Sequence, residues 1–323
     1  MAKLPKRPTH LLKDASPKTH LLIDGDVIAF MAAAAVQAVL IDDFGWAQPI
    51  ANTANGEACV ENFLTGLMLG LKGDTYEVVL SDPKENWRRG VDPNYKTNRT
   101  GPRPMLLGYL KDYLAREHGA EWWPELEADD TLSIKMTDPD YRTARGGCER
   151  RGFEGDGGVG WVTKDKLICV GRDKDFKSIP GLHHAIKQDV GPNGEMLVRE
   201  VTRWEADRFH LIQTLAGDAV DGFPGCPGIG MTRAAQIIDS PVRLVPQEGV
   251  KTRGVNKGES VTKWMAEPTA DLWACIVSHY RKAGQGEEEA LVTARLCRLL
   301  RWDEYDKSAN RITLWTPERL QGA

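Results

Sequence analysis

Three short apolar segments of this chain end in aspartates, and each segment predicts a buried β-strand. They are residues 21–26 with Asp24 and Asp26, residues 76–82 with Asp82, and residues 165–175 with Asp173 and Asp175. Helical patterns separate them, which indicates an α/β fold with a mainly parallel sheet, where ligands bind beyond the carboxyl ends of the strands. Converging acids repel one another unless cations neutralise them, so the sequence predicts a metal site at this edge.

Two further acidic motifs strengthen this prediction. EADD contributes Glu127, Asp129 and Asp130, and GDAVD contributes Asp218 and Asp221. Carboxylates without histidine or cysteine favour Mg²⁺ or Mn²⁺, and two such ions about 3.5–4 Å apart can hold the attacking and leaving oxygens of a phosphodiester. A solvated acidic rim is the alternative for any single residue, and interaction with a helix dipole is the alternative for Asp130.

The segment of residues 83–103, which follows the second predicted strand, is basic. Its bases are Lys84, Arg88, Arg89, Lys96, Arg99 and Arg103. These six bases face only two acids, which gives a local excess of four positive charges, and Trp87 and Tyr95 are interleaved with them. Bases contact phosphates and aromatic rings stack on nucleobases, so the segment favours a nucleic-acid surface, with an ordinary solvated loop as the alternative.

A glycine–proline motif, GDAVDGFPGCPGIG at residues 217–230, precedes a predicted helix over residues 231–238. Backbone N–H groups at a helix start bind phosphate, and glycine permits a phosphate to approach the main chain closely. A packing loop between two helices is the alternative. The residues of this element predicted to bind DNA are Gly225, Gly228, Ile229, Gly230 and Thr232.

The composition is that of a globular protein, with 323 residues, 41% hydrophobic residues and a net charge of −4. This acidic balance argues against a nucleic-acid binder unless the acids are gathered on metal ions. Six scattered cysteines without a C-x-x-C pair predict neither a zinc site nor a redox dithiol. We find no signal-peptide pattern and no stretch long enough to cross a membrane, so we expect an intracellular, cytoplasmic protein with no membrane partner.

Apolar spacing predicts further helices over residues 27–41, 57–72, 104–118, 202–216, 268–283 and 287–301. Residues 1–19 are predicted to be a flexible basic tail. Residues 137–160 are predicted to be a loop or insertion, and a polar stretch follows Ser240.

Seven motifs, in one order, resemble those of the 5′-nuclease superfamily, which includes phage 5′→3′ exonucleases, flap endonucleases and the 5′-nuclease domain of bacterial DNA polymerase I. They are IDGD, LSD, PNYKTNR, EADD, GRDKD, GDAVDGFPGCPGIG and EEEALVTARLCRLLR. The likeness runs over residues 21–300, and the size of the chain resembles that of the stand-alone phage exonucleases. Each motif alone is modest, but the shared order is specific.

The resemblance implies a PIN-like α/β catalytic domain over residues 20–200 with a helical arch at residues 83–118. It implies a helical DNA-binding region over residues 201–323 that contains a helix–three-turn–helix module. The implied ligands are Asp24, Asp82, Glu127 and Asp129 for one metal and Asp129, Asp173, Asp175 and Asp218 for the other, with Asp130 and Asp221 in support.

In the same way, Lys96 and Arg99 match arch bases that contact the scissile phosphate, and Tyr95 matches a residue that stacks on a nucleobase. Arg88 and Arg89 are expected to contact DNA, and the PGIG turn is expected to bind duplex backbone with K⁺. The predicted function is a metal-dependent 5′→3′ exonuclease of double-stranded DNA ends that uses two Mg²⁺ ions, replaceable by Mn²⁺, and leaves 5′-phosphates. Flap endonuclease activity, cleavage of RNA–DNA hybrids, and replication-protein partners stay open.

Two alternatives and one departure accompany this interpretation. A haloacid-dehalogenase-type phosphatase would use Asp24 as nucleophile but leaves EADD and PGIG unexplained. A catalytically silent DNA-structure binder is opposed by the intact acids. The departure is Gly171-Arg172, where relatives carry Ser or Thr with Gly; Arg172 either pairs with the acids or contacts DNA.

Overall fold

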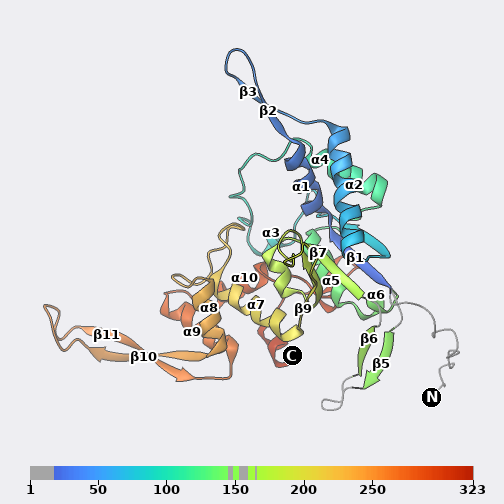
Figure 1. Cartoon of the computed structure of the whole chain (residues 1–323). Coiled ribbons are helices and arrows are strands. Elements are labelled where there is room, and N and C mark those ends of the chain that lie inside the picture. Colours follow the sequence, from blue (N-terminus) through green and yellow to red (C-terminus); the bar gives the residue numbers. More distant parts are fainter. Residues whose placement is uncertain (1–17, 145–147, 153–158, 164–165, 323) are drawn as a thin grey trace.

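The computed structural model describes residues 18–144, 148–152, 159–163 and 166–322 (Figure 1). Residues 1–17 of the predicted basic tail lie outside this part, and the first strand, β1 (Thr19–Asp24), begins at the end of that segment. Within the described residues, no helix combines the length and the apolar character needed to cross a membrane.

A five-stranded sheet forms the centre of the first half of the chain. Its order is β4 (Thr75–Val79), β1, β7 (Lys166–Gly171), β8 (Gly181–Ala185) and β9 (Arg199–Val201). The first four strands are parallel and β9 is antiparallel to β8, which confirms the predicted mainly parallel sheet. Because Asp24 pairs with Val79 and Ile23 with Val170, the chain leaves β1, β4 and β7 at one common edge.

Both faces of the sheet are covered. The helices α1 (Gly25–Val36), α2 (Thr53–Gly70) and α4 (Leu107–His118) pack on one face against Leu21 and Ile23. On the other face, Leu22 packs against α5 (Ala128–Thr137). This alternation of β1 side chains explains the all-apolar strand, since a strand buried on both faces has no polar side.

The second half of the chain is mostly helical. Its helices are α7 (Arg203–Ala216), α8 (Met231–Asp239), α9 (Leu272–Lys282) and α10 (Glu287–Leu296), which share one hydrophobic core. Thr202 and Glu205 form a reciprocal capping box that fixes the start of α7. The smaller elements are α3 (Arg88–Val91), α6 (Pro139–Ala144), η2 (Lys174–Ser178), η3 (Trp302–Glu304), β12 (Tyr305–Asp306), β13 (Arg311–Ile312) and η4 (Pro317–Gly322).

One sequence-based expectation about secondary structure is wrong, and a second is wrong in part. The helix predicted over residues 27–41 ends at Val36, and a hairpin of β2 (Ala38–Ile41) and β3 (Ala47–Ile50) follows. Its turn is closed by Asp42 Oδ1, which accepts hydrogen bonds from the backbone N–H groups of Phe44 and Trp46. The polar stretch after Ser240, for which the sequence predicted no element, forms a long antiparallel ribbon. Residues 137–160, predicted to be a loop or insertion, contain a helix and a hairpin in their described parts, so they are not a plain loop. The elements are β10 (Val242–Val250) with β11 (Ser260–Pro268), and α6 with the hairpin β5 (Cys148–Gly152) and β6 (Val159–Thr163).

The expected helical arch at residues 83–118 is also different. Only α3 and α4 are helices there, and the residues between them, 92–106, form turns and extended chain. Pro93, Pro102 and Pro104 explain this, because proline removes a backbone donor and clashes inside a helix. Figure 1 shows this stretch as an open loop that rises from α3 to the start of α4.

Gly25, which directly follows Asp24, is a position where the packing of the fold constrains the site. A Cβ atom at Gly25 would lie 2.6 Å from Val78 Cγ1 and 2.9 Å from the carbonyl oxygen of Val79. We predict that Gly25→Ala lowers the free energy of unfolding by about 1–3 kcal/mol, because α1 must move off β4. Gly66→Ala in α2 is the matched control, since nothing lies within 4 Å of its Cβ position, and it should stabilise by about 0.5–1 kcal/mol in urea unfolding. Equal effects of the two substitutions would contradict this packing argument.

Candidate active site

One group of carboxylates stands where β1, α5 and β7 meet. Asp24 caps α1, and its Oδ1 accepts hydrogen bonds from the backbone N–H groups of Asp26 at 2.9 Å and Val27 at 3.2 Å. Burial, followed by repulsion from Asp26 and Asp173, raises the pKa of Asp24 to about 8. Burial and the charges of Asp24 and Asp173 likewise raise the pKa of Asp129, which lies in the first turn of α5.

A second group lies beside the first. One carboxylate oxygen from each of Asp175, Asp218 and Asp221 falls within 4.8 Å of the others. Asp175 receives a 2.6 Å hydrogen bond from Gln213 Nε2 of α7, and burial together with Asp173 and Asp218 raises its pKa to about 7. The loop after α7 and the 3₁₀ turn after β7 therefore bring acids from distant parts of the sequence to one place.

Both groups fit divalent cations. Their members offer only carboxylate oxygens, the ligands that hard cations prefer. Burial and like-charge repulsion together raise the pKa values of Asp24, Asp129 and Asp175, and a bound cation would offset both costs. A solvated acidic rim does not explain them, because Asp24 and Asp218 are buried.

Two of the predicted arch bases face these acids. Lys96 Nζ lies 2.5 Å from Glu127 Oε1 and 3.4 Å from Asp221 Oδ2, and Arg99 pairs with Asp221. Burial alone would raise the pKa of Glu127, but Lys96 and Arg88 outweigh it and lower that pKa to about 2. The basic segment is thus in direct contact with the acids, as the motif order implied.

Arg88 and Asp130 do not lie where the sequence placed them. Arg88 is 1% exposed, and its guanidinium donates to both oxygens of Asp130 at 2.6 and 2.9 Å and to the carbonyls of Leu296 and Arg298. Asp130 is fully buried and also accepts from Trp87 Nε1 at 3.0 Å. The prediction that Arg88 contacts DNA and that Asp130 holds a metal is therefore wrong, because each satisfies the other inside the protein.

Tyr95 and Gly225 are also internal. The Tyr95 ring is 3% exposed and stacks on Phe223, while its hydroxyl donates to Glu127 at 2.9 Å, so it is not available to a nucleobase. Gly225 is buried with φ +68°, and its Cβ position lies 2.3 Å from the nitrogen of Gly217, so it shapes the loop and does not meet DNA. The prediction for both residues is wrong in this respect.

Asp82 lies apart from both carboxylate groups. Its oxygens accept hydrogen bonds from the backbone N–H groups of Lys84, Glu85 and Glu125 at 2.8 to 3.2 Å. Burial acts to raise its pKa, but these bonds lower it. Asp26 lies closer than Asp82 to the first carboxylate group, because it lines the smaller pocket with Asp24 and Asp129. Its Oδ1 lies 3.4 Å from the Ser81 nitrogen and 2.9 Å from Lys111 Nζ. The sequence placed Asp26 among the acids at this edge but outside the implied ligand sets, and its DGD spacing from Asp24 is the signal that could have added it to them.

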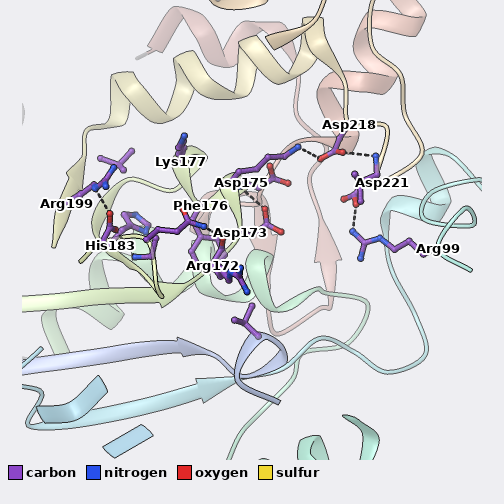
Figure 2. Close-up of a pocket in the computed structure, with 17 residues that line it drawn as sticks. Arg99, Arg172, Asp173, Asp175, Phe176, Lys177, His183, Arg199, Asp218 and Asp221 are labelled. Atoms are coloured by element: carbon purple, nitrogen blue, oxygen red, sulfur yellow. Dashed lines mark hydrogen bonds and ion pairs between the residues drawn. The ribbon is translucent and has the colours of Figure 1, made fainter. Parts of the chain in front are cut away.

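Two pockets open on the acids. The larger, about 570 Å³, contains Asp173, Asp175, Asp218 and Asp221, as Figure 2 shows. The smaller, about 240 Å³, contains Asp24, Asp26, Glu127 and Asp129. The residues that line both pockets are Val27, Arg99, Arg172 and Asp173. The two carboxylate groups therefore face neighbouring parts of one depression.

The remaining predicted DNA contacts lie on the surface. Arg89, Gly228, Gly230 and Thr232 are exposed, and Ile229 packs in part against the helical core. Gly230 is the N-cap of α8 and provides no side-chain cap, so the first N–H groups of this helix have no capping side chain.

Neighbouring aspartates of EADD should respond in opposite ways to neutralisation. In a chelator, Asp129→Asn should raise the melting temperature by about 2–4 °C, because it removes a buried carboxylate that neighbouring acids repel. Asp130→Asn should cost about 3 kcal/mol, because it leaves Arg88 buried without its full partner. Scanning calorimetry of the two variants tests this, and a loss of stability in Asp129→Asn would contradict the repulsion.

The repulsion also has a pH dependence. A carboxylate whose folded-state pKa is raised stabilises the fold at low pH and loses that contribution as the pH rises toward the raised value. For Asp24 and Asp175 that window ends at about 8 and about 7. We predict a lower melting temperature in chelator at about pH 8.5 than at about pH 5.5, and a larger rise on adding Mg²⁺ at the higher pH. An equal rise at both pH values would contradict the prediction.

Known proteins similar to this chain include two phage nucleases that match it nearly from end to end. The exodeoxyribonuclease of Enterobacteria phage T3 is 31% identical over 322 residues, covering 95% of this chain and 96% of the relative. The exonuclease of Escherichia phage T7 is 30% identical over 322 residues, with the same coverage of 95% and 96%. No protein-family model matches the chain.

A solved structure supports the architecture. The T5 D15 protein co-crystallised with metal ions superposes with a TM-score of 0.52 at 14% identity, covering 87% of this chain and 90% of that one. At this identity the likeness shows a shared fold. The two phage relatives are 31% and 30% identical over nearly their whole length, and on that ground the chain belongs to the 5′-nuclease superfamily and is a nuclease.

Proposed function

We propose that this chain is a metal-dependent 5′→3′ exonuclease that hydrolyses phosphodiesters at the ends of double-stranded DNA and leaves 5′-phosphates. The observation that carries this proposal is the pair of carboxylate groups, side by side at the carboxyl edge of a parallel sheet and faced by Lys96 and Arg99. The names of the phage relatives, exodeoxyribonuclease and exonuclease, support the same reaction.

The ligands divide between two cations. Asp24, Glu127 and Asp129 would hold one Mg²⁺, and Asp173, Asp175 and Asp218 would hold the other, with Asp221 beside it. Two such ions stabilise charge on the attacked phosphate and lower the pKa of the attacking water, and Mn²⁺ can replace Mg²⁺. Asp82 joins the first site only if its backbone hydrogen bonds are exchanged, so it has the weakest support.

The bases act on the substrate. Lys96 has φ +58° in a tight turn, and its backbone nitrogen donates to the Asp221 carbonyl at 2.9 Å, which fixes the turn against the acids. From this position Lys96 and Arg99 can stabilise the negative charge that develops on the scissile phosphate. Arg88 and Tyr95 donate hydrogen bonds to Glu127 from the protein interior, and so they position the site without touching DNA.

DNA docking is proposed at α7, the loop of residues 217–230 and α8, in the manner of a helix–three-turn–helix module. The backbone around Gly228 and Gly230 and the hydroxyl of Thr232 are exposed at the start of α8, where phosphate binds well. K⁺ bound by the carbonyls of this turn would add to that contact, and Arg89 lies exposed on α3. Backbone contacts do not read sequence, so RNA–DNA hybrids are also proposed substrates.

Lys96 gives the sharpest kinetic prediction. Lys96→Ala should lower kcat about 10²–10³-fold while the dissociation constant for DNA rises less than about tenfold, because the interaction strengthens as charge develops. Single-turnover cleavage and anisotropy binding separate the two quantities. A variant with normal kcat and weakened binding would show that Lys96 is only a ground-state contact.

The proposed activity is tested with 5′-labelled blunt duplex and 5′-flap DNA, in Mg²⁺ and in chelator. We expect metal-dependent release of labelled mononucleotides or short oligonucleotides from the blunt end, and Asp129→Asn should abolish it with the fold intact. Release of a single longer fragment from the flap would favour flap endonuclease activity. Absence of cleavage of both substrates in Mg²⁺ and in Mn²⁺ would refute the proposal.

A further inference from the structure

Arg172 is an exposed base of the site to which the proposed mechanism gives no role. It directly precedes Asp173 and lines both pockets, so it stands where the two carboxylate groups meet. Figure 2 shows Arg172 beside Asp173 among the residues that line the larger pocket. A cation in this place can either neutralise the acids or contact a substrate anion.

Arg172 differs from the other bases of the site in its ion pairing. Lys96 pairs with Glu127, Arg99 pairs with Asp221, and Lys174 Nζ lies 2.9 Å from Asp218. In the described part of the chain, the Arg172 guanidinium has neither a hydrogen bond nor an ion pair, although carboxylates surround it. Its charge is therefore not committed to an internal acid.

The main chain at this point is held firmly. The carbonyl of Gly171 accepts a 2.7 Å hydrogen bond from the Ile186 nitrogen, and a Cβ atom on Gly171 would lie 2.0 Å from the Phe176 ring. Phe176 is itself part of the core beneath the sheet edge. Only glycine fits before Arg172, so the exposed guanidinium projects from a fixed backbone.

The larger pocket has the size and lining of a nucleotide subsite. Its volume, about 570 Å³, lies in the range of about 300–1,000 Å³ typical of small-molecule sites. Its apolar lining includes Phe176, Val201 and Val220. Lys177 adds a second exposed base beside Arg172 in the lining of this pocket. A strand that passes over the acids would place one nucleotide here and the next phosphate against Arg172.

We propose that Arg172 binds a backbone phosphate adjacent to the scissile one, and so seats one nucleotide of the cleaved strand in the larger pocket. The inference rests on the proposed nuclease function and adds a substrate contact from the residue after β7, whereas Lys96 and Arg99 come from the loop after α3. Arginine suits the role, because its planar fork donates two hydrogen bonds to a phosphate.

The test compares Arg172→Gln and Arg172→Lys with the wild type. The matched control is Arg311→Gln, an exposed arginine of β13 that lines neither pocket. Binding of a fluorescein-labelled duplex with a 5′ single-stranded overhang is measured by anisotropy in chelator at NaCl concentrations between about 50 and 200 mM. Steady-state cleavage in Mg²⁺ supplies KM and kcat.

For Arg172→Gln we expect about tenfold weaker binding and a plot of log affinity against log salt that is shallower by about 0.7–0.9. KM should rise about tenfold with kcat within about threefold of wild type. Arg172→Lys should restore the salt slope, and Arg311→Gln should match the wild type. If Arg172 only neutralised the acids, Arg172→Gln would leave the slope and KM unchanged, and that result overturns the inference.

The failure of the inference is distinct from failure of the proposed function. Wild-type protein that binds DNA but never cuts it would refute the nuclease proposal, while the salt slopes would still decide whether Arg172 contacts phosphate. Wild-type cleavage with an unaltered Arg172→Gln variant would leave the nuclease proposal standing and remove Arg172 from the substrate contacts.

Discussion

Like-charge repulsion at one edge of a parallel sheet is the constraint on which this structure depends. Burial and the charges of neighbouring acids raise the pKa of Asp24 and of Asp129, and the same two causes raise the pKa of Asp175 in the adjacent group. An arrangement of this kind costs stability unless cations or bases offset it. A fold that keeps such a cost at its edge uses it for function, which is why the acids and not the overall charge identify the chemistry.

A buried arginine holds the surroundings of these acids together. Arg88 joins three parts of the chain, because it donates to Asp130 and Glu127 of the EADD motif and to main-chain carbonyls at Leu296 and Arg298 after α10. The same guanidinium lies 4.6 Å from the centre of the Trp87 ring. The basic segment therefore has two classes of base, one internal that builds the site and one, including Lys96, that faces it.

Much of the site could be predicted from the sequence because its signals are local. An apolar run that ends in an aspartate predicts both a buried strand and the place of that aspartate at the carboxyl edge of the sheet. The capping role of Asp24 follows from its position directly before α1. The exposure of single residues could not be predicted in this way. Arg88 and Arg89 are adjacent and chemically alike, yet the first is buried and the second exposed, since only the contact of α3 with α10 decides between them.

The same limit explains the errors in secondary structure. Residues 38–41 are apolar like the helix before them, but hairpin pairing with residues 47–50 outweighs helical propensity once Asp42 closes the turn. The ribbon of β10 and β11 has mixed polarity on both strands because it stands away from the core, so it lacks the alternation that marks a strand. The hydrogen bonds of Asp82 could not be predicted for a related reason, because one of its donors is the backbone N–H group of Glu125, which is distant in the sequence.

The central claim, that two neighbouring groups of carboxylates are two cation sites, is tested most directly by anomalous diffraction from crystals of the protein grown with Mn²⁺. The account predicts two peaks, one touching Asp24 and Asp129 and the other touching Asp175 and Asp218. A single peak, or none in either group at a Mn²⁺ concentration that supports DNA cleavage, would contradict it.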